Sequence, residues 1–395
     1  MKPTRRVPTY VSTIVLTVLV SLGATQLAFD QVASAQGQRV QAPVFQVDAT
    51  WPKPLPNHWV LGGVSGVAVD AQDHIWIVHR PGSLSNFEKA AALTPPTAEC
   101  CVPAPAVLEF DQAGSLLRHW GGPGPGYEWP QSEHGIYVDY KGNIWLGGSG
   151  RMDAHVLKFT KDGKFLMQIG HQGKNGGSND TENLGVPAGI QVDPSSNEVY
   201  IADGYGNHRV IVFDADSGAY KRHWGAYGKR PDDTGLPYFG EKGWPGNHDP
   251  SAPPARQFNI VHCIALSNDG LVYVCDRVND RLQVFKKDGT FVNEMMLSPQ
   301  TLGNGSAWAI GFSHDAQQRF LYFADGQNQR VNILQRDTLN ILNTFGNGGR
   351  QAGSFFGVHS LAVDSKGNIY TGETVEGKRL QRFLYKAPVA RGTSQ

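Results

Sequence analysis

Short apolar runs recur along the chain in a fixed order, and each run has the length of one β-strand. One unit consists of an apolar run, a turn, an aromatic-rich run, a polar loop, a third apolar run, a Gly-containing turn and a final strand. The first run of the unit recurs at residues 66–70, 135–139, 189–193, 263–267, 309–313 and 360–364. The third run recurs at residues 106–111, 155–160, 208–214, 280–285, 329–334 and 379–384. Four short antiparallel strands at a spacing of about 40 to 50 residues predict the blades of an all-β, six-bladed propeller.

The two ends of the chain predict how the ring closes. The first five repeats end in a fourth strand, whereas the sixth stops after Phe383, Leu384 and Tyr385. An alternating segment at residues 43–48 lies ahead of the first repeat. We expect this N-terminal strand to complete the last blade, which would remove an exposed sheet edge.

Composition agrees with this fold and narrows the class of partner. The 395 residues are 40% hydrophobic, and 47 glycines with 24 prolines suit a turn-dense β-protein. The 35 basic residues balance the 35 acidic ones, so a nucleic-acid partner is not indicated.

The N-terminus has the pattern of a targeting segment. Lys2, Arg5 and Arg6 precede an apolar stretch at residues 11–20, and Ala33-Ser34-Ala35 resembles a cleavage site. We expect residues 1–35 to be a signal peptide and residues 36–395 to be one propeller domain, with a retained membrane anchor as the alternative. No other stretch is long and apolar enough to span a membrane. The prediction is an exported protein, periplasmic or secreted, by the general or the twin-arginine route.

The four cysteines could form disulfides in such a compartment, but the sequence does not decide how they pair. Cys263 and Cys275 flank the turn at residues 268–270, where a hairpin would place them opposite each other. A cross-strand disulfide and a pair of buried free thiols both fit that position. Cys100 and Cys101 are adjacent in a Pro-rich loop and could form a vicinal disulfide or pair elsewhere.

Three histidines occupy the same place in alternate repeats. His134, His262 and His359 each begin the first strand of repeats two, four and six. The odd repeats carry Ser65, Ala188 and Trp308 at that position. Alternate blades of a six-membered ring lie about 120° apart, so three imidazoles would converge on the axis. Three imidazoles with an open fourth position are typical of a catalytic zinc site, although imidazoles also bind other divalent metals.

The direction of the strands places two arginines and a tyrosine on the same rim as these histidines. The start of the first strand and the end of the second strand share one rim, and Arg80, Tyr205 and Arg277 stand at second-strand ends. Two arginines beside a metal indicate an anionic ligand, most simply a carboxylate. A tyrosine next to a divalent cation and an arginine is a candidate base. Two long loops at the same rim, residues 81–105 and 226–256, would wall a pocket over the channel.

Other recurrent polar residues are expected to be structural. The arginines that open three of the third strands, Arg209, Arg281 and Arg330, should pair with Asp203, Asp276 and Asp325. The histidines of outer strands and turns, which are His119, His155, His208 and His223, are expected at the surface.

At these residues the chain resembles the NHL type of six-bladed propeller. More closely, residues 45–385 resemble the peptidyl-α-hydroxyglycine α-amidating lyases. The segments that carry the resemblance are residues 257–262 with 275–281, residues 203–209, and residues 78–80. The resemblance implies zinc on His134, His262 and His359, with Tyr205 as the base. It implies that Arg80 binds the substrate carboxylate and that Arg277 steadies either the phenolate of Tyr205 or the substrate. The implied reaction cleaves the N–C bond of an α-hydroxyglycine carbinolamide to an amide and glyoxylate.

The chain also departs from that family. Gly206 stands where the family has a disulfide cysteine, and Ser360 stands where it has an Asp linked to structural calcium. These departures argue against calcium and leave room for a different substrate. The chain has no space for the monooxygenase that makes the lyase's substrate, so a separate enzyme would supply the small or peptidic carboxylate.

Two other classes of function compete with the lyase. A metal-dependent hydrolase such as a lactonase also occurs on six-bladed propellers, but those sites favour Asp, Asn and Glu around calcium. A non-enzymatic NHL binding module would need none of the three histidines.

Overall fold

The fold is known from a computed structural model that describes residues 40–235 and 249–387. The predicted signal peptide, residues 1–35, lies outside the described residues. The described residues from Ala42 onward form one compact unit. Within the described ranges no helix has the length and apolar character needed to cross a membrane. The helices there are three short 3-10 turns, namely η1 (Pro81–Ser83), η2 (Ala90–Ala92) and η3 (Ala226–Gly228).

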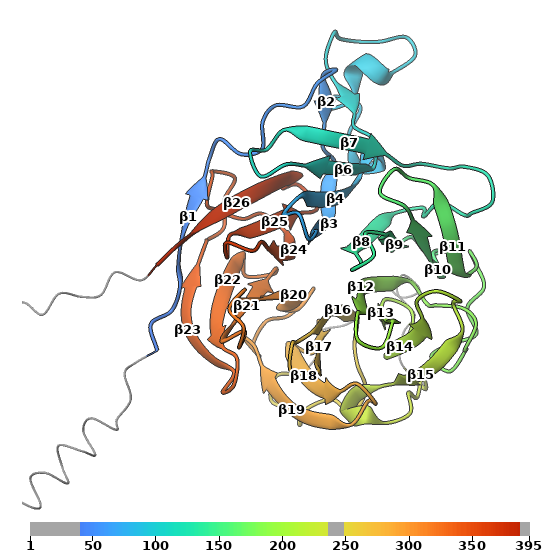
Figure 1. The fold of residues 1–395 in the computed structure, drawn as a ribbon, viewed down its shortest axis with the longest axis vertical. Helices are drawn as coiled ribbons and strands as arrows, with labels where there is room; N and C mark the ends of the chain where they lie inside the picture. Colours follow the sequence, from blue (N-terminus) through green and yellow to red (C-terminus); the bar gives the residue numbers. More distant parts are fainter. Residues whose placement is uncertain (1–39, 236–248, 388–395) are drawn as a thin grey trace, which may run out of the picture. The chain divides into compact units, whose positions relative to one another are not determined.

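Six four-stranded antiparallel sheets form the unit, and their first strands surround a common centre (Figure 1). The chain is therefore an all-β six-bladed propeller, as its repeats predict. Blade one comprises β3 (Gly63–Val69), β4 (Ile75–Arg80), β6 (Val107–Phe110) and β7 (Leu116–Trp120). Blade two comprises β8 (Glu133–Val138), β9 (Ile144–Gly148), β10 (His155–Phe159) and β11 (Phe165–Gly170). Blade three comprises β12 (Pro187–Asp193), β13 (Glu198–Asp203), β14 (Arg209–Asp214) and β15 (Tyr220–Trp224).

The second half of the ring repeats this order. Blade four comprises β16 (Val261–Leu266), β17 (Leu271–Asp276), β18 (Arg281–Lys286) and β19 (Phe291–Met296). Blade five comprises β20 (Ala307–Phe312), β21 (Phe320–Asp325), β22 (Arg330–Gln335) and β23 (Asn340–Phe345). Blade six comprises β24 (Val358–Val363), β25 (Ile369–Glu373), β26 (Arg379–Lys386) and β1 (Val44–Asp48). Outside the blades, β2 (Trp59–Val60) and β5 (Val102–Pro103) pair in parallel.

Blade six joins the two ends of the chain. Strand β1 pairs antiparallel with β26, with Val47 opposite Phe383 (Figure 1). The prediction that an N-terminal strand closes the last blade is confirmed. The pairing covers the edge of β26, which would otherwise offer unpaired backbone groups.

The core lies between neighbouring blades, and repeated polar residues tie each blade together. The arginines at third-strand starts are directly opposite the aspartates at second-strand ends. Arg209 lies 2.8 Å from Asp203, Arg281 lies 2.7 Å from Asp276, and Arg330 lies 3.1 Å from Asp325. The prediction that these are structural ion pairs is confirmed.

The expected exposure of four histidines is partly wrong. His119 is exposed, but His155 and His208 are buried. His155 shares a hydrogen bond with the carbonyl of Glu128 and His208 with that of Phe258, at 2.5 and 2.9 Å. The segments that precede β8 and β16 cover these two strand ends, and a strand pattern alone does not show such contacts.

Both pairs of cysteines form disulfides. Cys263 and Cys275 lie directly opposite each other on β16 and β17 and are joined. Cys100 and Cys101 form a vicinal disulfide in the loop that leads to β5. Of the alternatives that the sequence leaves open, the structure has the disulfide in each case.

Candidate functional site

A β-bulge at the start of every first strand aims one residue at the axis. The register of the ladder between first and second strands shifts at the same place in all six blades. A bulge leaves its extra residue unpaired and bends the strand, which redirects the side chain. In blade four the shift lies between Val261 and Cys263, so His262 is the residue that leaves the ladder. His134 and His359 lie within the corresponding shifts of blades two and six.

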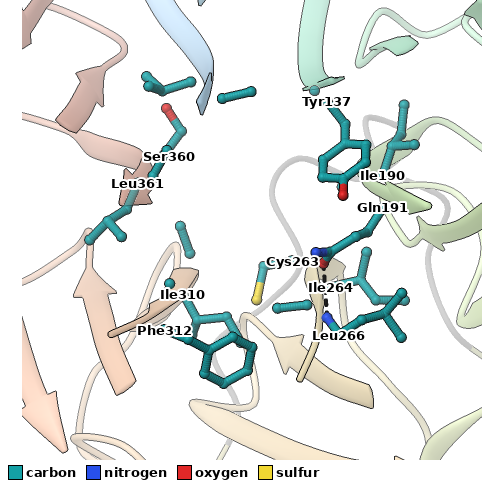
Figure 2. Close-up of a pocket in the computed structure, with 18 of the residues that line it drawn as sticks. Tyr137, Ile190, Gln191, Cys263, Ile264, Leu266, Ile310, Phe312, Ser360 and Leu361 are labelled. Carbon is teal, nitrogen blue, oxygen red and sulfur yellow. Dashed lines mark hydrogen bonds between the residues drawn. The ribbon is translucent and has the colours of Figure 1, made fainter. Parts of the chain in front are cut away.

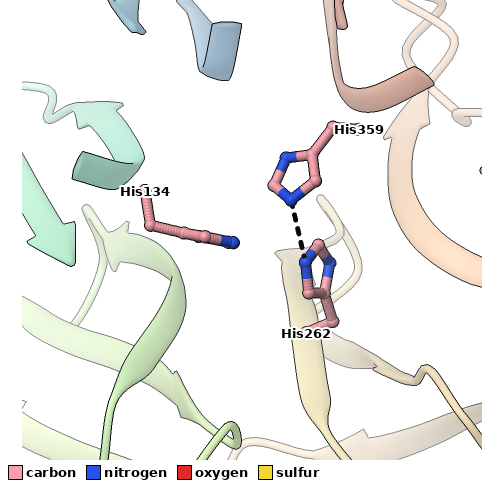
Figure 3. Close-up of side chains that lie close together, drawn as sticks. All are labelled: His134, His262 and His359. Carbon is pink, nitrogen blue, oxygen red and sulfur yellow. Dashed lines mark hydrogen bonds between the residues drawn. The ribbon is translucent and has the colours of Figure 1, made fainter. Parts of the chain in front are cut away.

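The three histidines converge as their spacing predicts (Figure 3). Each is at most 4% exposed, and one ring nitrogen from each lies within 4.8 Å of the others. The Nε2 atoms of His262 and His359 are 3.2 Å apart. The imidazoles of alternate blades therefore meet around one point.

Backbone carbonyls of the odd blades hold the imidazoles in one tautomer. His134 Nδ1 lies 3.2 Å from the Ala188 carbonyl oxygen, and His262 Nδ1 lies 2.5 Å from that of Trp308. The third pair joins His359 to Ser65. Because a carbonyl oxygen only accepts hydrogen bonds, each Nδ1 carries the proton and donates it. Each Nε2 then presents a lone pair to the axis, which is the arrangement of metal-binding histidines.

The electrostatics of this group fit a cation. Burial lowers the pKa of all three imidazoles well below their usual range, and the neighbouring cationic groups lower the pKa further. The three rings are therefore neutral near pH 7. Lone pairs of His262 and His359 that face each other across 3.2 Å repel unless a cation lies between them. Three neutral imidazoles whose lone pairs face one point match the ligand set of a divalent metal.

Tyr205 brings a hydroxyl to the same point. It follows β13 on the rim of the second-strand ends, and its ring packs with Val186, Ala188, Ile260 and Val278. Its Oη lies 3.0 Å from Nε2 of His134 and 2.9 Å from Nε2 of His262. Arg277 Nη1 donates a hydrogen bond to the same oxygen at 2.9 Å. The predicted base, two of the three imidazoles and one arginine thus meet at one atom.

Arg80 approaches from blade one and is the more exposed of the two arginines. Its Nε donates to the carbonyl of Glu133 at 2.8 Å, and its Nη2 donates to Ser149 Oγ at 2.9 Å. Burial lowers the pKa of both Arg80 and Arg277, and the nearby Tyr205 acts in the opposite direction. The sequence did not single out Glu133 and Ser149 as partners of Arg80. The one clue to Glu133 is its position directly before His134.

A cavity lies along the propeller axis, on the other side of the histidines from Tyr205. It holds about 760 Å³ and runs along the first strands from the histidines to their far ends. Its walls include Ile190, Ile264, Ile310 and Leu361, with Tyr137 and Gln191 as polar members (Figure 2). The pocket that we expected under the long loops belongs to the opposite rim, and the loop at residues 226–256 is described only in part.

A second group with metal-ligating atoms, Asp70, His74 and Glu109, lies in blade one. Its carboxylates already have cationic partners, since Lys161 lies 2.8 Å from Asp70 and Arg118 lies 2.6 Å from Glu109. This group therefore serves as an ion-pair network between strands, and sequence reasoning did not single it out.

Comparison with known proteins agrees with the class of fold. The NHL repeat profile matches residues 184–213 and 258–285. With its ring of six blades, the chain is a β-propeller, and two of its segments match the NHL repeat. The "NHL repeat-containing protein 3" of Mus musculus is 27% identical over 88% of this chain and 86% of its own length.

Other relatives carry the name of an enzyme. The "Probable peptidyl-alpha-hydroxyglycine alpha-amidating lyase pgal-1" of Caenorhabditis elegans is 23% identical over 81% of this chain and 82% of its own length. Among solved structures, the virginiamycin B lyase of Staphylococcus aureus has a TM-score of 0.50 at 14% identity. It matches 86% of this chain and 99% of the other, which bears on the fold alone. The chain thus has distant homologues named as amidating lyases.

Proposed function

We propose that this protein is a zinc-dependent lyase that cleaves the N–C bond of an α-hydroxyglycine-type carbinolamide. The products are an amide and glyoxylate. The observation that carries the proposal is the set of contacts at Tyr205 Oη, where two imidazoles and a guanidinium lie within 3.0 Å. The distant homologues named as amidating lyases support the same reaction class.

Each residue has one task in the proposed reaction. His134, His262 and His359 hold zinc, which acts as a Lewis acid toward the substrate hydroxyl when it is bound. Tyr205 takes the proton of that hydroxyl. The electron pair of the O–H bond forms the aldehyde C=O bond, and the C–N bond breaks. Tyr205 then passes this proton to the leaving amide nitrogen, so atoms and charge balance.

The arginines divide between the substrate and the base. Arg80 binds the substrate carboxylate, because it is half-buried at the rim and its guanidinium suits a bidentate anion. Arg277 steadies the oxygen of Tyr205, to which it already donates a hydrogen bond.

The setting of the reaction follows from its chemistry. The substrate is a small or peptidic molecule with a free carboxylate, and a separate monooxygenase supplies it by hydroxylating a glycine α-carbon. The two disulfides suit an oxidising compartment, which supports export to the periplasm or the medium.

The test is glyoxylate release from N-benzoyl-α-hydroxyglycine by the zinc-loaded protein. We expect Tyr205→Phe to slow release by at least about 100-fold while its zinc content stays unchanged. Tyr220→Phe, at an exposed tyrosine, is the matched control and should keep full activity. Absence of release by the wild type, or undiminished release by Tyr205→Phe, would refute the proposal.

A non-enzymatic binding module is the second candidate, because a relative that matches 88% of the chain is named only for its repeats. It predicts that binding partners are retained when His134, His262 and His359 are replaced together by alanine. A metal-dependent hydrolase would instead be favoured if the purified protein contained calcium and no zinc.

A further inference from the structure

Trp308 differs from the residues at the equivalent positions of the other odd blades. Ser65 and Ala188 begin blades one and three, and their side chains are small. The indole of Trp308 is 5% exposed and extends to the guanidinium of Arg277. The guanidinium carbon lies 4.0 Å from the centre of an indole ring, which is close for a cation–π contact.

Two features hold the indole in one orientation. Its Nε1 donates a hydrogen bond of 2.6 Å to the carbonyl of Gly305. Gly326 lies against the ring so closely that a Cβ at that position would be 2.2 Å from indole Cδ2. Only glycine therefore leaves room for the ring, and the indole is a rigid platform and not a mobile cover.

Arg277 is oriented by this platform and by the segment next to it. Its Nε donates to the carbonyl of Asn304 at 2.8 Å, adjacent to the Gly305 carbonyl that fixes the indole. With one edge held by Asn304 and one face held by Trp308, the guanidinium directs Nη1 at Tyr205 Oη. The direction of the Arg277 side chain thus depends on a residue of the next blade.

The same indole adjoins the imidazoles without supplying a ligand. Its ring centre is 6.0 Å from that of His262 and 5.5 Å from that of His359. The hydrogen bond to His262 comes from the backbone carbonyl of Trp308, so replacing the side chain leaves it in place. Metal binding and guanidinium orientation can therefore be separated by substitution.

We propose that Trp308 is a positioning residue, whose indole holds Arg277 against Tyr205 and thereby supports proton transfer by Tyr205. Its effect on catalysis rests on the proposed lyase function, whereas its effect on Arg277 does not. Trp308 acts through Arg277, whereas the proposed partner of the substrate carboxylate is Arg80. Loss of Trp308 should therefore lower kcat and leave KM nearly unchanged.

The experiment compares Trp308→Leu, which removes the aromatic face, with Trp308→Phe, which retains one. In protein labelled with ¹⁵N-arginine, hindered rotation gives separate guanidinium resonances, and those of Arg277 are assigned by their loss in Arg277→Met. We expect Trp308→Leu to lose these separate resonances and Trp308→Phe to keep them. Zinc content should be the same in all three proteins. Retention of the resonances in Trp308→Leu would overturn the proposal.

Kinetics provide the second readout. With N-benzoyl-α-hydroxyglycine, we expect Trp308→Leu to lower kcat about ten- to thirtyfold and to change KM less than about twofold. Trp308→Phe should restore most of the loss. Combining Trp308→Leu with Arg277→Met should add little to Arg277→Met alone, because both act through one contact. Fully additive losses would overturn the proposal. A wild type that shows the hindered resonances but releases no glyoxylate would refute only the lyase function.

Discussion

Nδ1 of His359 lies 2.8 Å from the carbonyl oxygen of Ser65, although the two residues are 294 positions apart in the chain. The contact crosses the junction where blade six meets blade one. It repeats the contact of His134 with Ala188 and that of His262 with Trp308. Each even blade thus contributes an imidazole, and the odd blade that follows contributes the carbonyl that orients it.

This alternation explains why all six bulges matter to one site. A bulge in an even blade turns a histidine toward the axis, and a bulge in an odd blade frees a carbonyl from the strand ladder. The proton on Nδ1 leaves a lone pair on Nε2. The ring of blades therefore fixes both the position and the tautomer of the three imidazoles before any metal binds.

Replacement of one imidazole should remove tight metal binding. We expect elemental analysis of the purified wild type to find about one zinc per chain, and His262→Ala to bind zinc at least about 100-fold more weakly. His171→Ala is the control, because that side chain is 70% exposed and is not one of the three converging histidines. Equal zinc content in wild type and His262→Ala would contradict a zinc site on the three histidines.

Arg80→Met should act on the substrate carboxylate. We expect it to raise KM for N-benzoyl-α-hydroxyglycine about 10- to 100-fold, since a charged hydrogen bond contributes about 1.5 to 3 kcal/mol. Zinc content should not change, because the contacts of Arg80 are to Glu133 and Ser149. An unchanged KM would show that the anion binds elsewhere.

Arg281→Met separates this role from a structural one. Arg281 and Asp276 form a fully buried pair at 2.7 Å. Its removal leaves an uncompensated buried carboxylate, so the free energy of unfolding should fall by about 3 to 5 kcal/mol. Denaturant unfolding measures this loss, and Arg80→Met should show much less of it. A stable Arg281→Met protein with raised KM would reverse the two assignments.

The sequence alone predicts the fold and the convergence of the three histidines because both repeat with the blades. The positions of His134, His262 and His359 follow from the repeat, and the rim shared with Tyr205 follows from strand direction. What it does not predict depends on contacts between blades. The stacking of Trp308 on Arg277 joins residues of blades four and five through a loop carbonyl, and no strand pattern encodes it.

A cavity on the far side of the histidines is equally hard to predict. Loop length suggests a pocket on the rim of Tyr205, and this stays a prediction because the loop at residues 226–256 is described only in part. The described cavity runs from the histidines toward the far ends of the first strands. That space depends on how far side chains such as Ile264 and Leu361 extend across the axis, which is a property of packing.

His79 should make the stability depend on pH. It is fully buried, its Nδ1 accepts the Gly62 N–H at 3.1 Å, and its Nε2 donates to the Pro105 carbonyl at 2.9 Å. Burial lowers the pKa of His79 from its usual 6.5 to about 4. Between pH 6.5 and pH 4, His79 therefore binds a proton in the unfolded chain but stays neutral in the folded chain. The protein therefore has its full stability with respect to His79 above pH 6.5. The free energy of unfolding falls by roughly 3 kcal/mol as the pH drops to 4.

Denaturant unfolding of wild type and His79→Asn between pH 7 and pH 4 measures this contribution. The difference between the two proteins isolates His79 from the other buried histidines, which titrate in both. We expect the wild type to lose stability more steeply with falling pH. Parallel curves would show that His79 takes up its proton at the same pH in the folded and unfolded chain.

Phe45 on β1 should determine how firmly the ring is closed. Its ring is half-buried and lies 5.3 Å from that of Tyr322 and 5.2 Å from that of Phe345, which belong to blade five. Phe45→Ala removes these contacts from the strand that covers the edge of β26, so the free energy of unfolding should fall by about 2 to 4 kcal/mol. Val44→Ala, at a side chain that is 48% exposed on the same strand, should change it by less than about 0.5 kcal/mol. Equal effects of the two substitutions in denaturant unfolding would mean that the backbone ladder to β26, and not side-chain packing, holds the N-terminal strand in blade six.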